Sequence, residues 1–428
     1  MTDTIFALSS GAPPAGIGII RVSGPAARQA LQALFGRLPE PRVARLGLLR
    51  DPRDGAPLDR ALLLWFPGPA TVTGEDLAEL HCHGGRAVIA AVEDALSALP
   101  GLRRAEAGEF TRRAFHNGRM DLNAVEGLAD LLAAETQQQR RAALLMAEGH
   151  FSRRIEQWRL RLLDLSAMAE AALDFSDEDD VPDTGIEVRI QKGLADLAQE
   201  VGVVLAAPSA ERLRDGVRVV LAGPPNAGKS TLLNALVGRD AAIVSDIAGT
   251  TRDRIEVPAA LGGTAFLFTD TAGLRQDTGD VIEAIGMDRA RSALDAADII
   301  LWLGSADELP RDDAILIAAQ CDRAAEGGAR RGLRVSARTG EGMEQLIGAV
   351  LERAGHLLPG EGDYALHDRQ RAGVAQLHGH VSAAAGTDDL LIVAEEMRQA
   401  RDGIDAITGR AGTEDMLDRL FAGFCIGK

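Results

Sequence analysis

The chain has 428 residues and a formal net charge of −17 at pH 7, with 46% hydrophobic and 25% charged residues. This length exceeds what one hydrophobic core usually fills, so we expect two or three domains, one of them discontinuous. The acidic balance disfavours broad, non-specific binding to nucleic acid, although it leaves room for a local basic patch. No window approaches the roughly 18 apolar residues of a membrane span, so we expect a cytoplasmic protein without membrane contact.

The N-terminal segment, 1–119, alternates short apolar runs with glycine and proline punctuation. The runs 16–20 and 61–66 are examples, and this pattern is typical of a mixed α/β domain. From 120 to 213 apolar residues recur every three or four positions and turn residues become rare, which predicts long amphipathic helices. We therefore expect an α/β domain followed by the first part of a helical domain.

A strand and helix alternation begins at Val217 and defines an α/β domain over 214–355. Helical periodicity returns in 356–428. We interpret this last segment as the second part of the helical domain, so that the second α/β domain is an insertion within the helical one. The predicted fold class is therefore α/β plus all-α.

A glycine-rich loop occupies residues 223–230 with the sequence Gly-Pro-Pro-Asn-Ala-Gly-Lys-Ser. The apolar run 217–222 before it suits a buried parallel strand and a helix opens after it, which is the context that a phosphate-binding loop requires. Its N–H groups would surround phosphate oxygens, with Lys229 reaching the β and γ phosphates in a catalytic role and Ser230 ligating Mg²⁺. The residues expected around the phosphates are Asn226, Ala227, Gly228, Lys229, Ser230 and Thr231.

Two later runs look like the γ-phosphate-sensing switches of a GTPase. The run 249–253 offers a hydroxyl for Mg²⁺ at Thr251, and Asp270, which follows the apolar run 265–268, would hold Mg²⁺ mainly through water. The Gly273 N–H would sense the γ phosphate. The residues expected to contact GTP or its metals here are Ser245, Asp246, Ile247, Ala248, Gly249, Thr250, Thr251, Asp270, Thr271, Ala272 and Gly273.

The base-recognition run departs from the usual GTPase pattern Asn-Lys-x-Asp. Residues 319–322 read Ala-Gln-Cys-Asp, so only Asp322 remains to accept hydrogen bonds from guanine N1 and N2. The run Ser336-Ala337-Arg338 resembles the last GTPase element and also favours guanine. We interpret the base as guanine, with adenine as the alternative, because an aspartate leaves groups unpaired against the wrong purine edge.

The interval between two predicted parallel strands, 299–303 and 314–317, is unusually short. It spans 304–313, whereas a parallel crossover normally needs a dozen or more residues. We expect the usual helix there to be cut to a turn or lost, and nucleotide affinity to be weakened.

Four runs resemble the family of tRNA modification GTPases called MnmE, or TrmE, over essentially the whole chain. They are 16–24 (Gly-Ile-Gly-Ile-Ile-Arg-Val-Ser-Gly), 73–76 (Thr-Gly-Glu-Asp), 108–111 (Gly-Glu-Phe-Thr) and the terminal 424–428 (Phe-Cys-Ile-Gly-Lys). The resemblance implies an N-terminal folate-binding and dimerising domain, a helical domain and an inserted P-loop GTPase domain.

The resemblance also implies an activity and partners. Family members act with the FAD protein MnmG (GidA) to place an aminomethyl-type group on carbon 5 of the wobble uridine of certain tRNAs. The carbon comes from a tetrahydrofolate derivative, and GTP hydrolysis gates the process. A homodimer that binds tRNA is therefore expected.

The same resemblance assigns roles near the phosphates. K⁺ would be bound by Asn226, Ser245, Ile247 and Thr250, and would supply a fixed positive charge beside the β and γ phosphates. Arg252 is then a switch or surface residue rather than an arginine finger. Glu283 lies in a Glu-x-Ile-Gly run and would orient the attacking water; the alternative is a solvated carboxylate at a helix start.

A folate site and a reactive cysteine also follow from the resemblance. Arg21, Glu79, Arg119 and Lys428 would bind the tetrahydrofolate derivative; without the resemblance, Arg21 and Glu79 would be taken for surface charges. Cys425 would be required for tRNA modification, as nucleophile or as acid/base. Prenylation of Cys425 is a poor alternative, because the last two residues do not fit the usual tetrapeptide.

The run 81–85 (His-Cys-His-Gly-Gly) leaves a metal site open as an alternative, because residues two apart on a strand share a face. We favour a packed strand and turn, since no third ligand is evident. Three functions compete: a K⁺-stimulated GTPase in tRNA modification, a non-catalytic nucleotide switch, and a ribosome-assembly GTPase. The folate-like N-terminus and terminal cysteine argue against the third, and steady GTP turnover without a partner would separate the first two.

Overall fold

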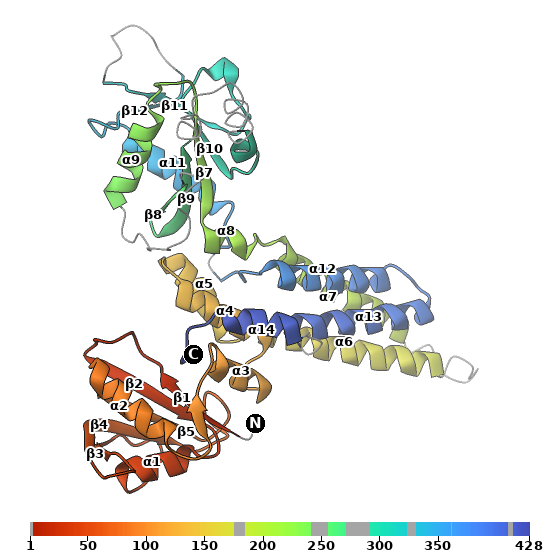
Figure 1. Cartoon of the computed structure of the whole chain (residues 1–428). Coiled ribbons are helices and arrows are strands. Elements are labelled where there is room, and N and C mark those ends of the chain that lie inside the picture. Colours follow the sequence, from red (N-terminus) through yellow and green to blue (C-terminus); the bar gives the residue numbers. More distant parts are fainter. Residues whose placement is uncertain are drawn as a thin grey trace. The chain divides into compact units, whose positions relative to one another are not determined.

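A computed structural model describes residues 3–174, 185–240, 256–270, 291–322, 331–360, 362–409 and 414–428 (Figure 1). The chain divides into two compact units. One comprises 1–129 together with 408–428, and the other comprises 130–407.

The first unit is built on a six-stranded sheet in the order β3-β4-β5-β2-β1-β6. All neighbours are antiparallel except β1 and β6, which run parallel. The strands are β1 (Thr4–Leu8), β2 (Ile17–Ser23), β3 (Arg45–Arg50), β4 (Pro57–Phe66), β5 (Leu77–His83) and β6 (Leu102–Arg104). Strand alternation sends Ile20, Leu63 and Leu80 into a core with helices α1 (Ala27–Phe35) and α2 (Arg86–Ser97).

Two segments from opposite ends of the sequence meet in the same unit. The helices are α3 (Glu109–His116), the start of α4 (Leu122–Ala133) and α14 (Glu414–Ala422). Leu122, Val125, Phe421 and Phe424 form one buried cluster, and Phe115 of α3 packs against it. The last part of the segment 356–428, with α14, therefore packs in the N-terminal unit.

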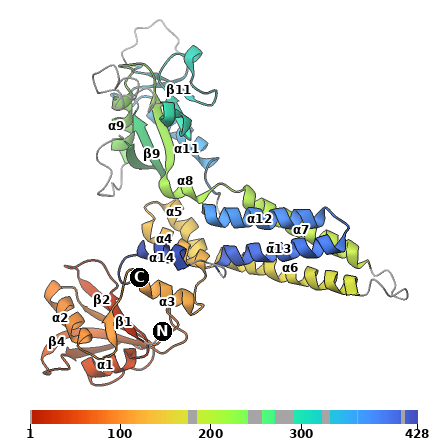
Figure 2. The same cartoon turned by 45° about the vertical axis from the view of Figure 1, so that its right-hand side comes forward.

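The second unit contains a helical bundle in which α6, α7, α12 and α13 run side by side (Figure 1 and Figure 2). Some helices of this unit precede its strands in the sequence, and others follow them. The former include α5 (Gln137–Ala147), α6 (His150–Asp174), α7 (Ile186–Ala206) and α8 (Ala210–Asp215), and the latter include α12 (Asp368–Ala385) and α13 (Leu390–Thr408). Trp158, Leu194, Leu377 and Ile404 are among the side chains buried between them. The three- and four-residue apolar spacing therefore faces one shared core.

A second six-stranded sheet completes this unit, in the order β12-β11-β10-β7-β9-β8. Its strands are β7 (Val217–Ala222), β8 (Glu256–Leu261), β9 (Thr264–Asp270), β10 (Ile299–Trp302), β11 (Ile315–Ala319) and β12 (Leu333–Val335), all parallel to their neighbours except β8. Helices α9 (Lys229–Asp240) and α11 (Met343–Gly355) pack on it. The predicted fold class, α/β plus all-α with an inserted nucleotide-binding domain, is confirmed.

Two local predictions are also confirmed. The predicted strand 217–222 is β7 as drawn from the sequence. Between β10 and β11 the chain makes only a single 3₁₀ turn, η2 (Ala306–Glu308), in place of the usual crossover helix. Within the part of the chain that the structure describes, no helix is both long and apolar enough to traverse a bilayer.

Candidate functional site

The glycine-rich loop 223–230 leaves the carboxyl end of β7 and runs into α9. Gly223 has φ 146° and Gly228 has φ 96°, values that favour glycine. A side chain at 223 would also lie 3.1 Å from the carbonyl carbon of Leu303. The helix begins at Lys229, two residues earlier than the sequence suggested, so its N-terminus adjoins the loop.

The ammonium group of Lys229 is bound by backbone carbonyl oxygens of the loop. Its Nζ donates to the carbonyl oxygens of Gly223, at 2.9 Å, and Pro224, at 2.8 Å. Lys229 is buried. An ammonium held inside the loop places a positive charge where phosphate oxygens would lie.

Ser230 and Asp270 meet in front of this loop. The Ser230 hydroxyl donates a hydrogen bond of 2.5 Å to Oδ2 of Asp270, which is 4% exposed at the end of β9. A hydroxyl and a carboxylate in contact are the oxygen donors that Mg²⁺ prefers. The donor set therefore fits the predicted metal, and its third predicted ligand, Thr251, lies outside the described residues.

The two predicted base-recognition runs are adjacent. Asp322 Oδ1 accepts a 2.8 Å hydrogen bond from the Ser336 hydroxyl, and Ser336 is fully buried at the end of β12. Backbone pairing of Cys321 N–H with the Val335 carbonyl joins the same runs. One oxygen of Asp322 is thus fixed, and its carboxylate stands exposed at the carboxyl edge of the sheet with Ala337 and Arg338 following Ser336.

Several predicted residues cannot be placed. They fall in two stretches, 241–255 and 271–290, that lie outside the described residues. They are Ser245, Asp246, Ile247, Ala248, Gly249, Thr250, Thr251, Thr271, Ala272, Gly273 and the proposed water-orienting Glu283.

Arg21 and Glu79 form a half-buried ion pair on the sheet face opposite α1 and α2. They are opposite each other in the pairing of β2 with β5. Nε and Nη2 of Arg21 donate to Oε1 of Glu79 at 3.2 Å and 3.0 Å. His81 follows on the same face, its Nε2 3.3 Å from Glu79 Oε2. The Arg21 guanidinium also lies 5.8 Å from the Phe110 ring centroid. Sequence reasoning missed this use of His81, although its two-residue spacing from Glu79 signals a shared face.

Arg119 lies elsewhere, on the loop 71–75. Its Nε donates to the Thr71 carbonyl at 3.1 Å. Ser23 holds the same loop from β2 through hydroxyl contacts to Thr73, at 2.8 Å, and to Glu75, at 2.9 Å. The structure therefore brings Arg21 and Glu79 into contact, while Arg119 contacts the loop 71–75 instead.

A buried arginine connects this loop to α3. Arg113 is fully buried and donates to Glu75, Glu109 and Asp3. Burial opposes ionisation of Glu109, but hydrogen bonds led by Arg103 outweigh it and lower the pKa of that carboxyl. Burial likewise opposes ionisation of Asp3, yet its pKa is lowered by the two arginines. The sequence run 73–76 carried the signal for this network, but no role had been assigned to it.

The C-terminal tail lies beside β1, the strand that pairs with the one carrying Arg21. Ile426 bridges to Ala107, and a side chain at Gly427, which has φ 96°, would lie 2.2 Å from the Leu8 carbonyl oxygen. Leu8 pairs with Ile20, the neighbour of Arg21. Cys425 is exposed, and its carbonyl accepts from the Lys428 N–H at 3.2 Å.

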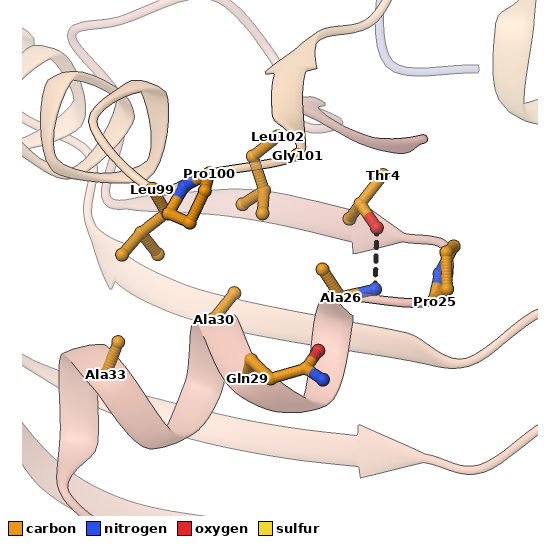
Figure 3. A pocket seen from close by; sticks show the side chains of 10 residues that line it. All are labelled: Thr4, Pro25, Ala26, Gln29, Ala30, Ala33, Leu99, Pro100, Gly101 and Leu102. Atoms are coloured by element: carbon orange, nitrogen blue, oxygen red, sulfur yellow. Dashed lines mark hydrogen bonds between the residues drawn. The ribbon is translucent and has the colours of Figure 1, made fainter. Parts of the chain in front are cut away.

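A cavity of about 440 Å³ lies on the α1 side of the same sheet (Figure 3). Its wall consists of one face of α1, with Ala30 and Gln29, and the segment 99–102. The Thr4 hydroxyl there accepts from the Ala26 N–H at 2.7 Å. None of the described residues that line the cavity is charged, so they do not supply the groups that a folate carboxylate would need.

The metal alternative at 81–85 has little support. Cys82 is buried in the core, where burial raises its pKa to about 12, and His83 is bonded to Asp59 at 2.7 Å. Among the described residues, no three His, Cys, Asp or Glu side chains gather to hold a metal. Residues 81–83 form the end of β5, with Cys82 packed in the core, in line with the strand part of the favoured interpretation.

Comparison with known proteins decides the family. A family model described as the MnmE helical domain matches residues 122–425, and one described as the GTP-binding protein TrmE N-terminus matches 4–119. A protein of Rhizorhabdus wittichii named tRNA modification GTPase MnmE is 60% identical over 100% of this chain and 97% of its own. The chain belongs to the MnmE family.

Other relatives agree. A Sphingopyxis alaskensis protein of the same name is 58% identical over 96% of this chain and 100% of its own. The solved G domain of the FeoB iron transporter of T. maritima is 25% identical over 32% of this chain and 98% of its own, with a TM-score of 0.24; the assignment rests on the MnmE relatives and not on this likeness. The MnmE family is one of GTPases, so the predicted family and enzyme class are both confirmed.

Proposed function

We propose that this chain is a K⁺-stimulated GTP hydrolase that acts with the FAD protein MnmG in modification of carbon 5 of the tRNA wobble uridine. The observation that carries the hydrolase part is the meeting of Lys229, Ser230 and Asp270 at one loop. Lys229 holds positive charge at the phosphate position, and the other two present oxygen to Mg²⁺. Membership of a family named for tRNA modification supports the substrate.

Guanine is the base that this site would accept best. Ser336 donates to Oδ1 of Asp322 and leaves Oδ2 to accept hydrogen bonds from the ligand. Guanine offers N–H groups at N1 and N2, which a carboxylate accepts, whereas adenine offers none at those positions. Ordering of Asp322 by a buried serine supports GTP over ATP.

The phosphates would be activated by two cations and one carboxylate. Mg²⁺, when bound, neutralises charge on the β and γ phosphates, and K⁺ supplies a further fixed charge. Asn226, whose φ of 60° turns the loop at this point, would bind K⁺ together with Ser245, Ile247 and Thr250. Glu283 would orient the attacking water.

The face that carries Arg21 and Glu79 is the proposed tetrahydrofolate site. A guanidinium pairs with carboxylates, and Glu79 can accept N–H groups of a pterin ring. Arg119 and Lys428 complete the set, and the tail with Cys425 runs beside the neighbouring strand β1. Cys425 would then act on the one-carbon unit or on the uridine as nucleophile or acid/base. A homodimer in the cytoplasm completes the proposal.

Analysis of tRNA from cells that lack the protein tests this function. Nucleoside mass spectrometry should show loss of the C5 modification at the wobble uridine. Wild-type chain should restore it, and Lys229→Ala should not. Unchanged wobble uridine in the deletion strain would refute the proposal, and restoration by Lys229→Ala would refute the requirement for GTP hydrolysis.

A further inference from the structure

Two non-glycine residues with positive φ lie close together at the nucleotide loop, one within the loop and one beside it. Among the described residues, the non-glycine residues with positive φ are Arg42, Asn226 and Gln320. Asn226 has φ 60° within the loop, and Gln320 has φ 57° immediately after β11. Such a backbone conformation costs free energy outside glycine and persists only where surrounding contacts hold it.

The side chain of Gln320 supplies such a contact. Its Nε2 donates to the Asn226 carbonyl oxygen at 3.4 Å. A Cβ placed on Gly228 would come within 3.1 Å of the same nitrogen. The Gln320 amide therefore lies across the loop, over Gly228 and against the Asn226 peptide.

This contact joins two ends of the nucleotide site. Gln320 is two residues before Asp322, whose carboxylate is fixed by Ser336. Asn226 belongs to the same loop, 223–230, as Lys229 and Ser230. A neutral amide here adds no charge to the loop, so its effect is one of position.

We propose that Gln320 is a positioning residue that holds the Asn226 peptide in its left-handed conformation and so orients the Asn226 side chain. The side-chain direction at a residue follows from its backbone conformation. The proposal rests on the proposed function, in which Asn226 binds the monovalent cation. Gln320 thereby couples the base-recognition run to the cation site.

The test is the K⁺ concentration that gives half-maximal GTP turnover by the full-length chain at fixed Mg²⁺. Gln320→Ala removes the amide and Gln320→Gly also removes the backbone strain. Both should raise the half-saturating K⁺ concentration by about three- to tenfold, the value of one neutral hydrogen bond. Gln320→Lys restores a donor of sufficient reach and should stay within about twofold of wild type.

Gln399→Ala is the matched control, because Gln399 is a half-buried glutamine whose side chain donates a hydrogen bond to Glu395 on α13. It should leave K⁺ dependence unchanged, and thermal unfolding should show that all variants fold. If the substitutions at 320 acted only by destabilising the fold, Gln320→Lys would not recover the wild-type K⁺ dependence.

Two failures are distinguishable. Wild-type turnover that is equal in K⁺ and Na⁺ would overturn the cation part of the proposed function. A wild-type K⁺ response that stays the same in Gln320→Ala and Gln320→Gly would overturn the positioning role alone. A loss in Gln320→Ala that Gln320→Gly repairs would assign the effect to backbone strain, and would likewise overturn it.

Discussion

The Ser230 hydroxyl donates a 2.5 Å hydrogen bond to Oδ2 of Asp270, joining the first turn of α9 to the end of β9. The two residues are far apart in sequence, yet Asp270 ends β9 and Ser230 lies in the segment that follows β7, the parallel neighbour of β9. Carboxyl ends of such strands converge at one edge of a sheet, which is where α/β proteins bind ligands. Several consequences can be measured.

Replacing Ser230 by alanine should lower GTP turnover by about two orders of magnitude, since the metal stabilises transition-state charge by several kcal/mol. Ser230→Thr keeps the hydroxyl and should retain most activity. Steady-state phosphate release over a Mg²⁺ titration measures both. Full turnover in Ser230→Ala at low Mg²⁺ would remove the metal role.

Asp322→Asn should move base preference from guanine toward xanthine. The amide presents N–H groups against the N–H groups of guanine, whereas xanthine carries a carbonyl at C2. One unpaired buried group corresponds to about 10- to 100-fold weaker GTP binding. Competition between GTP and XTP measures the shift. Equal affinity for GTP in wild type and variant would argue against this use of Asp322, and Ser336→Ala should give a smaller loss.

The network of Arg113 should make the chain sensitive to acid. The pKa values of Asp3 and Glu109 are lowered in the folded state from 3.8 and 4.5. Their ionised forms therefore stabilise folding above the unfolded pKa values, and that contribution is lost as pH falls below about 4 through the folded values. The melting temperature should therefore decrease less between neutral and acid pH in Glu109→Gln than in the wild type. An unchanged acid slope would contradict the assignment.

The three cysteines should differ in reactivity. Cys82 is buried with a pKa of about 12, and desolvation together with Glu341 raises the pKa of Cys321, whereas Cys425 is exposed. Since the thiolate is the reacting form, iodoacetamide on the native chain should modify Cys425 first and Cys82 last. Peptide mass spectrometry measures the order. Labelling of Cys82 before Cys425 would contradict this order. In a separate assay, the Cys425→Ser variant should still hydrolyse GTP while leaving tRNA unmodified.

The sequence predicted what depends on neighbours along the chain. The strand 217–222 and the loop after it could be identified because apolar run, glycines and helix start are contiguous. The short connection 304–313 could be predicted to lack a helix from its length alone. By contrast, periodicity shows that a segment is helical but not which core it joins, so the placement of α14 in the N-terminal unit was not predictable.

Contacts between distant residues also escaped prediction. Arg113 approaches Glu75 across 38 positions and Gln320 approaches Asn226 across 94. No local pattern encodes such a pairing, because it depends on how strands and loops are ordered in the sheet. The ion pair of Arg21 and Glu79 was expected only as two members of one site; their direct contact follows from strand register.

Steady-state GTP turnover by the purified chain, compared in KCl and NaCl at equal ionic strength with Mg²⁺ present, tests the central claim most directly. We expect many turnovers per chain in K⁺ and none above background in Lys229→Ala. In Na⁺ the rate should be lower by at least about tenfold, because the fixed charge contributes on the order of 1.4 kcal/mol or more. Turnover that is absent in both salts, or equal in both, would contradict it.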